Sequence, residues 1–227
     1  MKTQLATMLL AASTVWGQSA SPKWQEFSIG APTEKHSSFS RFGIRAEGVP
    51  FKRVLSRAYG APENRILGPQ WLADERYALT AIVADPKDFQ PLLQQELTTL
   101  FHMLTHRETR VIPVYVLKPL EGAAKLTAPG AGRTAETSSD SRGFNSVKLP
   151  HATLAEFAEM LGDTVGRPVI DETHMEGAFD LTLSWKASSI SALQAAVKNQ
   201  LGLDLADEQR AVDVLVIDQI EKLKFSK

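Results

Sequence analysis

The strongest constraint on the fold of this chain is that its two halves resemble each other. Residues 77–80 (YALT) match residues 179–182 (FDLT) at an offset of 102. Beyond the next loop the offset becomes 100, and residues 93–116 align with residues 193–216 without a gap. Self-similarity at a fixed period is typical of structural repeats. The sequence therefore predicts two similar units produced by an internal duplication.

Each unit is predicted to have the order strand–helix–strand–strand–helix–strand, which makes the fold class α+β. In the first half the expected strands are 24–29, 39–46, 77–83 and 110–117, and the expected helices are 51–59 and 92–104. In the second half the expected strands are 144–149, 168–170, 179–185 and 211–217, and the expected helices are 154–165 and 190–201.

Local signals mark the ends of these helices. Pro50 suits the first turn of a helix, and Gly60 suits the end of one. Thr153 and Glu156 have the spacing of a capping box, in which each side chain satisfies a free backbone N–H at the start of a helix.

Composition divides the chain into four segments. Residues 1–20 begin with a positive charge, continue with an apolar stretch and end in small residues, which is the layout of a secretory signal peptide. Residues 121–141 are rich in Gly, Ala, Ser and Thr, so we expect a flexible linker there. The two units are then 24–120 and 142–227. No later segment is long and apolar enough to span a membrane.

Charge and cysteine content narrow the possible partners. Lys and Arg number 25 against 26 Asp and Glu, for a net charge of −1, which argues against nucleic acid. The chain has no cysteine, so it has neither disulfides nor the lipid-modified cysteine of a bacterial lipoprotein. With the predicted signal peptide, these features indicate an exported protein, periplasmic or secreted. No sequence motif indicates that the protein binds a cofactor.

Five residues are candidate ligand contacts. Trp71, Tyr77 and Trp185 are aromatic side chains of the type enriched at binding surfaces, although such side chains also anchor cores. Asp171 and His174 lie in a polar turn between two predicted strands.

The same turn contains a grouping of acids and histidine. Glu172 and Asp180 accompany Asp171 and His174, so a hydrolase or sensor site within 171–180 is the alternative to a plain polar turn. Acid–base catalysis needs a cleft and tuned pKa values. The chain has no G-x-S-x-G motif, no H-E-x-x-H motif and no phosphate-binding glycine loop. We therefore predict no catalytic residues.

A pair of histidines has the spacing of a metal site. His102 and His106 lie four residues apart near the predicted helix 92–104, and this spacing can bind zinc from one helix face. No third ligand is evident. The alternative is a pair of surface histidines at a helix end, where the helix dipole favours them.

An acid interrupts the apolar strand 211–217. Asp213 aligns with Pro113 at the offset of 100. Proline is confined to sheet edges, strand starts or bulges, and an unpaired carboxylate is costly to bury. We expect Asp213 to lie near the start of its strand and to be at least partly exposed.

Several motifs together resemble one protein family. They are Ala58-Tyr59-Gly60, Gly68-Pro69-Gln70-Trp71-Leu72, Arg76-Tyr77, Pro113-Val114-Tyr115, Val169-Ile170-Asp171 with Gly177 and Asp180, Gln200-Leu201-Gly202-Leu203 and Val216-Ile217-Asp218. The mature chain is similar to an uncharacterised family of exported proteins expanded in Acidobacteria such as Solibacter. Related domains occur fused to membrane metallopeptidases of the antibiotic-sensor type. The chain departs from the family at His174-Met175, where Gly-Leu is usual, and at Lys222-Leu223-Lys224, where a proline is usual. The family has no assigned function, so the resemblance implies no catalytic residues.

A second resemblance concerns the fold. The strand 169–171, Gly177 and the strand after it are similar to the small N-terminal modules of secretins and TonB-dependent receptors, which mediate protein contacts in the periplasm. The resulting hypothesis is a non-enzymatic periplasmic binding or adaptor module for a cell-envelope protein or peptide. Its sheet edges would accept a partner strand. The alternative is a cell-envelope hydrolase or sensor domain that uses residues 171–180.

Overall fold

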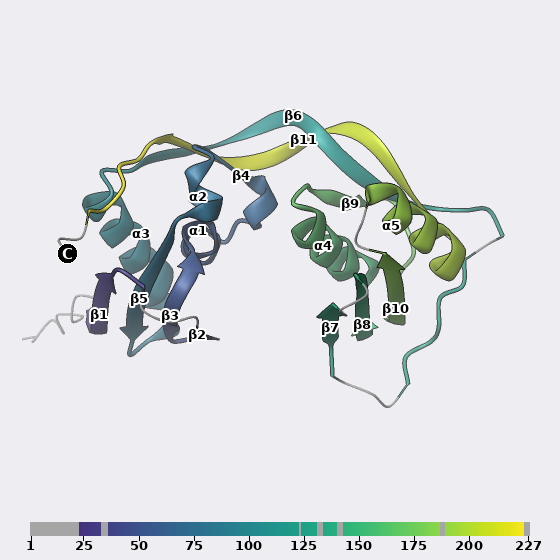
Figure 1. The fold of residues 1–227 in the computed structure, drawn as a ribbon, viewed down its shortest axis with the longest axis horizontal. Coiled ribbons are helices and arrows are strands. Elements are labelled where there is room, and N and C mark those ends of the chain that lie inside the picture. The colour runs from purple at the N-terminus through teal and green to yellow at the C-terminus, as the bar shows by residue number, and fades with distance from the viewer. Residues whose placement is uncertain are drawn as a thin grey trace, which may run out of the picture.

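A long two-stranded ribbon spans two α+β bodies (Figure 1). The structure is a computed structural model and describes residues 23–32, 36–122, 124–130, 134–139, 143–186 and 189–224. The α+β class predicted from the sequence is confirmed. The predicted signal peptide, residues 1–20, lies outside the described residues.

The first body is built on a four-stranded antiparallel sheet of order β1-β5-β3-β2. Its strands are β1 (Trp24–Gly30), β2 (His36–Ser40), β3 (Gly43–Pro50) and β5 (Arg76–Val83). Its helices are α1 (Phe51–Tyr59), α2 (Trp71–Asp74) and α3 (Phe89–Leu100), with the 3-10 turns η1 (Glu63–Arg65) and η2 (Pro86–Asp88).

The predicted helix 51–59 is confirmed as α1. Its buried side chains are Phe51, Val54, Leu55 and Ala58, which recur at helical spacing on the face that packs into the core. Gly60 ends the helix in the left-handed conformation, with φ of 60°. An αL residue is the usual helix stop, and glycine adopts it without a Cβ penalty.

The second body is built on a three-stranded sheet of order β10-β8-β7. Its strands are β7 (Glu136–Ser139), β8 (Phe144–Ala152) and β10 (Phe179–Lys186). Its helices are α4 (Leu154–Val165), α5 (Ile190–Ala196) and the π-helix η3 (Val197–Leu201), and the last two together occupy the predicted helix 190–201. The predicted capping box is confirmed, because the Thr153 hydroxyl accepts from Glu156 N at 3.2 Å and the Glu156 carboxylate accepts from Thr153 N at 2.8 Å.

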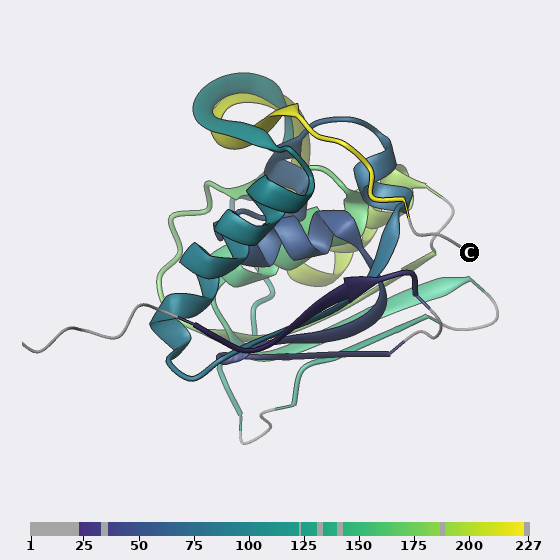
Figure 2. The same cartoon turned by 90° about the vertical axis from the view of Figure 1, so that its left-hand side faces the viewer.

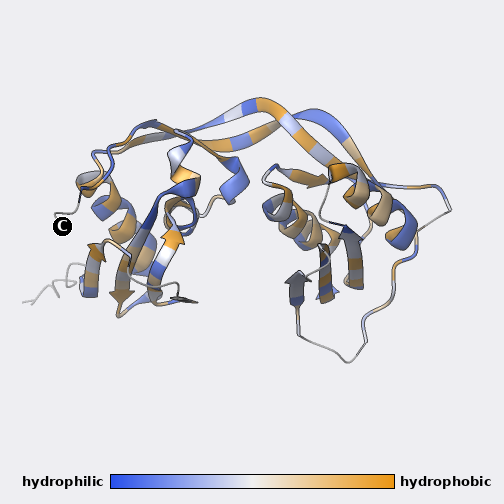
Figure 3. Ribbon diagram, viewed as in Figure 1, coloured by the Kyte–Doolittle hydropathy of each residue, from blue (hydrophilic) through white to orange (hydrophobic). Residues whose placement is uncertain are grey.

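Both bodies have the same layers, which Figure 2 shows from the side: sheet below, helices in the middle and ribbon above. Apolar residues concentrate in the strands and helices of each body (Figure 3). Each body has a core of its own, and each core includes residues from the ribbon.

The ribbon consists of β6 (Leu104–Pro119) and β11 (Leu203–Gln219), which pair antiparallel along nearly their whole length. Both strands are longer than predicted. The helix α3 is correspondingly shorter than predicted and ends at Leu100, because His102 adopts a φ of 47° and turns the chain out of the helix. Leu104, the last residue of the predicted helix, begins β6 and is 58% exposed.

Each ribbon strand completes the body that belongs mainly to the other half of the chain. Tyr115 and Leu117, near the end of β6, are buried in the core of the second body. Leu215 and Ile217, near the end of β11, are buried in the core of the first. Two short parallel strands widen the ribbon, β4 (Ile66–Leu67) alongside β11 and β9 (Val169–Asp171) alongside β6.

Parts of the segment 121–141, which is predicted to be a flexible linker, have regular structure. Its residues Glu136–Ser139 form β7. Thr127 makes an isolated bridge to Asp180, and Gly130 N donates to the Asp180 carboxylate at 2.7 Å. The residues of β7 are all exposed and pair through their backbone, so their composition does not predict the strand. The proposed unit boundaries stay a prediction.

Asp213 is exposed, as predicted. Its expected location near the start of a strand is wrong, because it lies well inside β11. It is exposed there because it projects to the outer face of the ribbon, opposite to its buried neighbours Val212 and Val214. Its Oδ1 accepts a hydrogen bond of 2.6 Å from the Thr109 hydroxyl on β6.

Candidate binding cleft

A cleft lies between the two bodies and contains two pockets, of about 340 and 720 Å³. The smaller pocket is lined by η1 on the first body and by α4 and β9 on the second. The larger pocket is lined by Arg53 of α1, Thr137 of β7 and the α4 residues Glu156, Glu159 and Asp163, among others. Both halves of the chain therefore contribute to each pocket.

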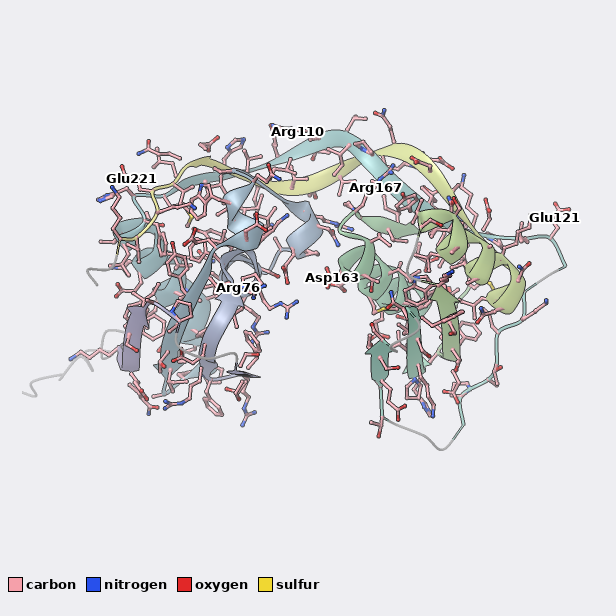
Figure 4. The ribbon with its side chains drawn as sticks, in the orientation of Figure 1. Arg76, Arg110, Glu121, Asp163, Arg167 and Glu221 are labelled. Atoms are coloured by element: carbon pink, nitrogen blue, oxygen red, sulfur yellow. The ribbon has the colours of Figure 1, made fainter. Side chains whose placement is uncertain are left out.

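A hydrogen bond joins the two bodies inside this cleft. Asn64 Nδ2 donates to Asp163 Oδ1 at 3.2 Å. Asp163 lies on the side of α4 that faces the first body (Figure 4). Gly162 permits this approach, because a Cβ added there would lie 2.9 Å from Asn64 Nδ2 and 3.2 Å from Val169 N. A larger residue would displace the Asn64 amide and crowd the backbone between Arg167 and Val169.

The second-body side of the cleft is acidic. Partial burial, and then the nearby carboxylates of Glu63 and Glu159, raise the pKa of Asp163. Arg53 acts in the opposite direction, but its guanidinium is already paired with Glu63 at 2.8 Å. Among the described residues, neither Glu159 nor Asp163 forms an ion pair. We call the surface formed by Glu156, Glu159 and Asp163 the α4 wall.

Within the described part of the chain, each sheet ends at the cleft in a strand that is paired on one side only. The edge strands are β2 and β7, and Figure 1 places them at the nearest edges of the two sheets. Figure 2 shows the two sheets at the same level. An edge strand presents backbone N–H and C=O groups that have no ladder partner. Neither strand contains proline or lysine, two residues that commonly block pairing at an edge.

A comparison with known protein families assigns the chain to one of them. The family described as "Protein of unknown function (DUF3738)" matches residues 52–220. The chain belongs to this family. The DUF3738 match runs from α1 to just past β11, and so includes α1, β7 and the α4 wall. No curated protein and no solved structure matches the chain.

Membership of a family of unknown function agrees with the resemblance seen in the sequence. The expansion of that family in Acidobacteria stays a prediction, and so does the likeness to secretin and TonB-receptor modules. Within the described part of this DUF3738 protein, no helix has the length and apolar character needed to cross a membrane.

The acid and histidine residues of 171–180 do not converge on one site in this DUF3738 fold. Asp171 lines the smaller pocket, and its Oδ1 accepts from Thr173 N at 2.9 Å and from the Thr173 hydroxyl at 2.6 Å. Glu172 instead pairs with Arg210 of the ribbon at 2.8 Å, and the guanidinium lowers the pKa of Glu172. His174 is exposed, with a φ of 55°.

Two of the three aromatic candidates pack in the first body. Tyr77 is buried, its ring lies edge-on to Phe51 and Phe101, and burial raises the pKa of its hydroxyl. Trp71 stacks on Phe51 with ring centroids 6.3 Å apart, and Lys222 Nζ lies 5.0 Å from the Trp71 ring. The contacts of both are those of core anchors, and their role as ligand contacts stays a prediction.

Trp185 lines a separate pocket of about 270 Å³ in the second body, together with Arg167 and Tyr115. The Arg167 guanidinium stacks on the Tyr115 ring at 4.2 Å from its centroid. It also pairs with Asp207 at 2.5 Å and donates to Val114 O at 3.0 Å. These contacts hold the Arg167 side chain against both β6 and β11. The positive charge that Arg167 brings to this pocket is therefore already balanced by Asp207.

The two histidines of the possible metal pair do not share a helix face, and that premise is wrong. His102 lies in the turn after α3, and His106 lies on β6. His106 Nδ1 is 2.7 Å from Asp218 Oδ2, and this contact, with a weaker one to Glu108, raises the pKa of His106. Within the described residues, no group of three or more His, Asp or Glu is placed to hold a metal ion.

Asp171 was singled out from the sequence as a candidate ligand contact and lines the smaller pocket, but most of the other residues that form the cleft were not. Asn64, Thr137, Glu159 and Asp163 are ordinary polar residues of a turn, an edge strand and an exposed helix face. One signal was present in Gly162, which lies inside the predicted helix 154–165. The helix α4 continues to Val165, and a glycine inside a helix indicates close approach of another segment.

Proposed function

We propose that this protein is an exported, non-enzymatic adaptor that binds an extended segment of another cell-envelope protein in the cleft between its two bodies. The observation that carries the proposal is the pair of open edges, β2 and β7, on facing sides of the cleft. An added strand gains main-chain hydrogen bonds at such an edge, and neighbouring pockets select its alternate side chains.

Export is supported by the signal-like layout of residues 1–20 and by a chain without cysteine. Residues 1–22 fused to a reporter enzyme that is active only outside the cytoplasm should yield activity. A fusion that stays inactive while being expressed would contradict export.

The alternative, a hydrolase or sensor site within 171–180, receives less support. Glu172 is neutralised by Arg210, and Asp171 is held by Thr173. Asp180 accepts from two backbone N–H groups, which lower the pKa of its carboxyl and keep it charged. Each acid thus has a separate structural partner, whereas acid–base catalysis would require these groups to face one substrate.

We also infer that the two halves arose by duplication. The ribbon register supports this, because Val111 and Ala211, which are 100 residues apart, pair with each other near the middle of β6 and β11. A shift of 100 residues therefore exchanges β6 and β11 and leaves their pairing unchanged. Such a register is what an approximate twofold axis through the middle of the ribbon would produce.

A displayed library of random extended peptides, selected against the purified protein, tests the adaptor function. Proline is introduced separately at Thr137 and at Ser138, since successive N–H groups of a strand point to opposite edges. One variant breaks the ladder to β8, while the other leaves the fold intact and removes an outward N–H. Alanine at the same positions is the control, because it keeps the N–H.

The folded proline variant should lose the selected peptides, and its alanine control should keep them. Hydrogen exchange should slow at β7 when peptide binds the unmodified protein. Equal binding by both proline variants, or a library without enriched peptides, would refute the proposal.

A further inference from the structure

We propose that the segment bound in the cleft is cationic, adds to the outer edge of β7, and directs every second side chain, lysine or arginine, at Glu159 and Asp163 of the α4 wall. This inference rests on the proposed adaptor function. It specifies which of the two sheet edges, β2 or β7, binds the partner, and it specifies the charge of the partner segment.

The first step is the choice of edge. Arg57 of α1 donates to Ser40 O at 3.1 Å, so part of the β2 backbone already has a side-chain partner. Among the described residues, the hydrogen bonds of β7 (Glu136–Ser139) run to β8 alone. Within the described residues, no side chain from outside the sheet bonds to the backbone of β7, whereas one does so at β2.

The second step is the direction of the side chains. Thr137 lies opposite Val147, which is fully buried in the second core, so both side chains project to the helix side of the sheet. Thr137 accordingly lines the larger pocket with Glu159 and Asp163. A strand added to β7 continues this alternation, because side chains of directly paired residues lie on the same face. Every second residue of the partner then points into the larger pocket.

The third step is the charge that those side chains meet. Glu156 is engaged in the capping box at the start of α4, and Arg53 across the cleft is paired with Glu63. Glu159 and Asp163 form no ion pair within the described residues, and like charges surround Asp163. A lysine or arginine placed between Glu159 and Asp163 relieves this repulsion. Complementary charge of this kind selects partners and speeds association.

The probes are three fluorescein-labelled octapeptides in which threonine alternates with lysine, glutamine or glutamate. Affinity is measured by fluorescence anisotropy at two salt concentrations, and contact with β7 by hydrogen exchange. The lysine peptide should bind on the order of tenfold more tightly than the glutamine peptide at low salt. The difference should shrink at high salt, because ions screen exposed charges.

The variant Glu159→Gln/Asp163→Asn should abolish this preference. Its control is Glu121→Gln/Glu221→Gln, which removes two exposed carboxylates away from the cleft; Figure 4 places Glu121 on the far side of the second body and Glu221 on the far side of the first. The control should keep the preference. Thermal unfolding of both variants checks that they are folded.

The outcomes separate this inference from the proposed function. If all three peptides protect β7 and bind equally, the cationic partner is refuted and strand addition stands. A lysine preference that survives Glu159→Gln/Asp163→Asn, or that disappears in the control, also overturns the inference. If no peptide protects β7 in the folded protein, both proposals fall.

Discussion

Leu117→Ala should destabilise the second body, even though Leu117 belongs to the first half of the chain. Its side chain is 0% exposed and packs in the core that contains α4 and α5. Truncation to alanine loses the transfer free energy of the buried carbons and leaves a cavity, at a cost of about 2–5 kcal/mol. Because no part of the side chain reaches water, we expect ~3 kcal/mol. Leu215→Ala should have the same effect on the first body.

Hydrogen exchange at single backbone amides measures the opening free energy of each body separately. In Leu117→Ala, the amides of β8 and β10 should lose protection by the expected amount, and those of β3 and β5 should keep theirs. Leu104→Ala is a matched control, since it makes the same change on the same strand where the side chain is 58% exposed, and should cost below about 0.5 kcal/mol. If Leu117→Ala weakens the first body instead, or both bodies equally, the reasoning is refuted.

Three further outcomes follow from the fold and its charges. A protease site inserted within 121–141 should be cleaved without separating the fragments, because the ribbon strands cross between bodies; two species on size-exclusion chromatography would contradict this. Asp163→Asn should stabilise the protein at pH 7 and have no effect near pH 3, as denaturant unfolding at both pH values can check. The raised pKa of Asp163 means that its carboxyl group binds a proton more tightly in the folded state than in the unfolded state. The carboxylate therefore costs stability as the pH rises. Solvent exposure of the side chain keeps this cost below about 1 kcal/mol. Asp213→Asn should change the unfolding free energy by less than about 1 kcal/mol, because the residue is exposed and an amide oxygen can still accept from Thr109; a cost several times larger would show that the charge is needed.

The elements that could be predicted from the sequence are those fixed by neighbouring residues. Thr153 and Glu156 start α4 through bonds that span three residues, and Gly60 ends α1 through its own backbone conformation. Such signals act within one turn, so a single sequence contains them completely. The apolar periods of α1 and β10 are equally local, and both elements appear where they were expected.

The features of the fold that could not be predicted depend on which of the two bodies each ribbon strand joins. Tyr115 and Leu117 are apolar and were expected to be buried, but nothing in their pattern says that they enter the core of the other half. The cleft exists only because of that crossing, so its residues had no sequence signal as a group. The strand β7 was missed for a different reason: its four residues are all exposed, so no apolar alternation marks it.

The crossing of the ribbon strands also sets the order in which the protein can fold. The core of the first body contains Ile217, while Trp24 packs against the same core from the other end of the chain. Contacts over such sequence separations carry a large loop-closure entropy and slow folding. A nascent chain that stops before β11 leaves this core open to water. The first body is therefore the first to be synthesised and the last to be completed.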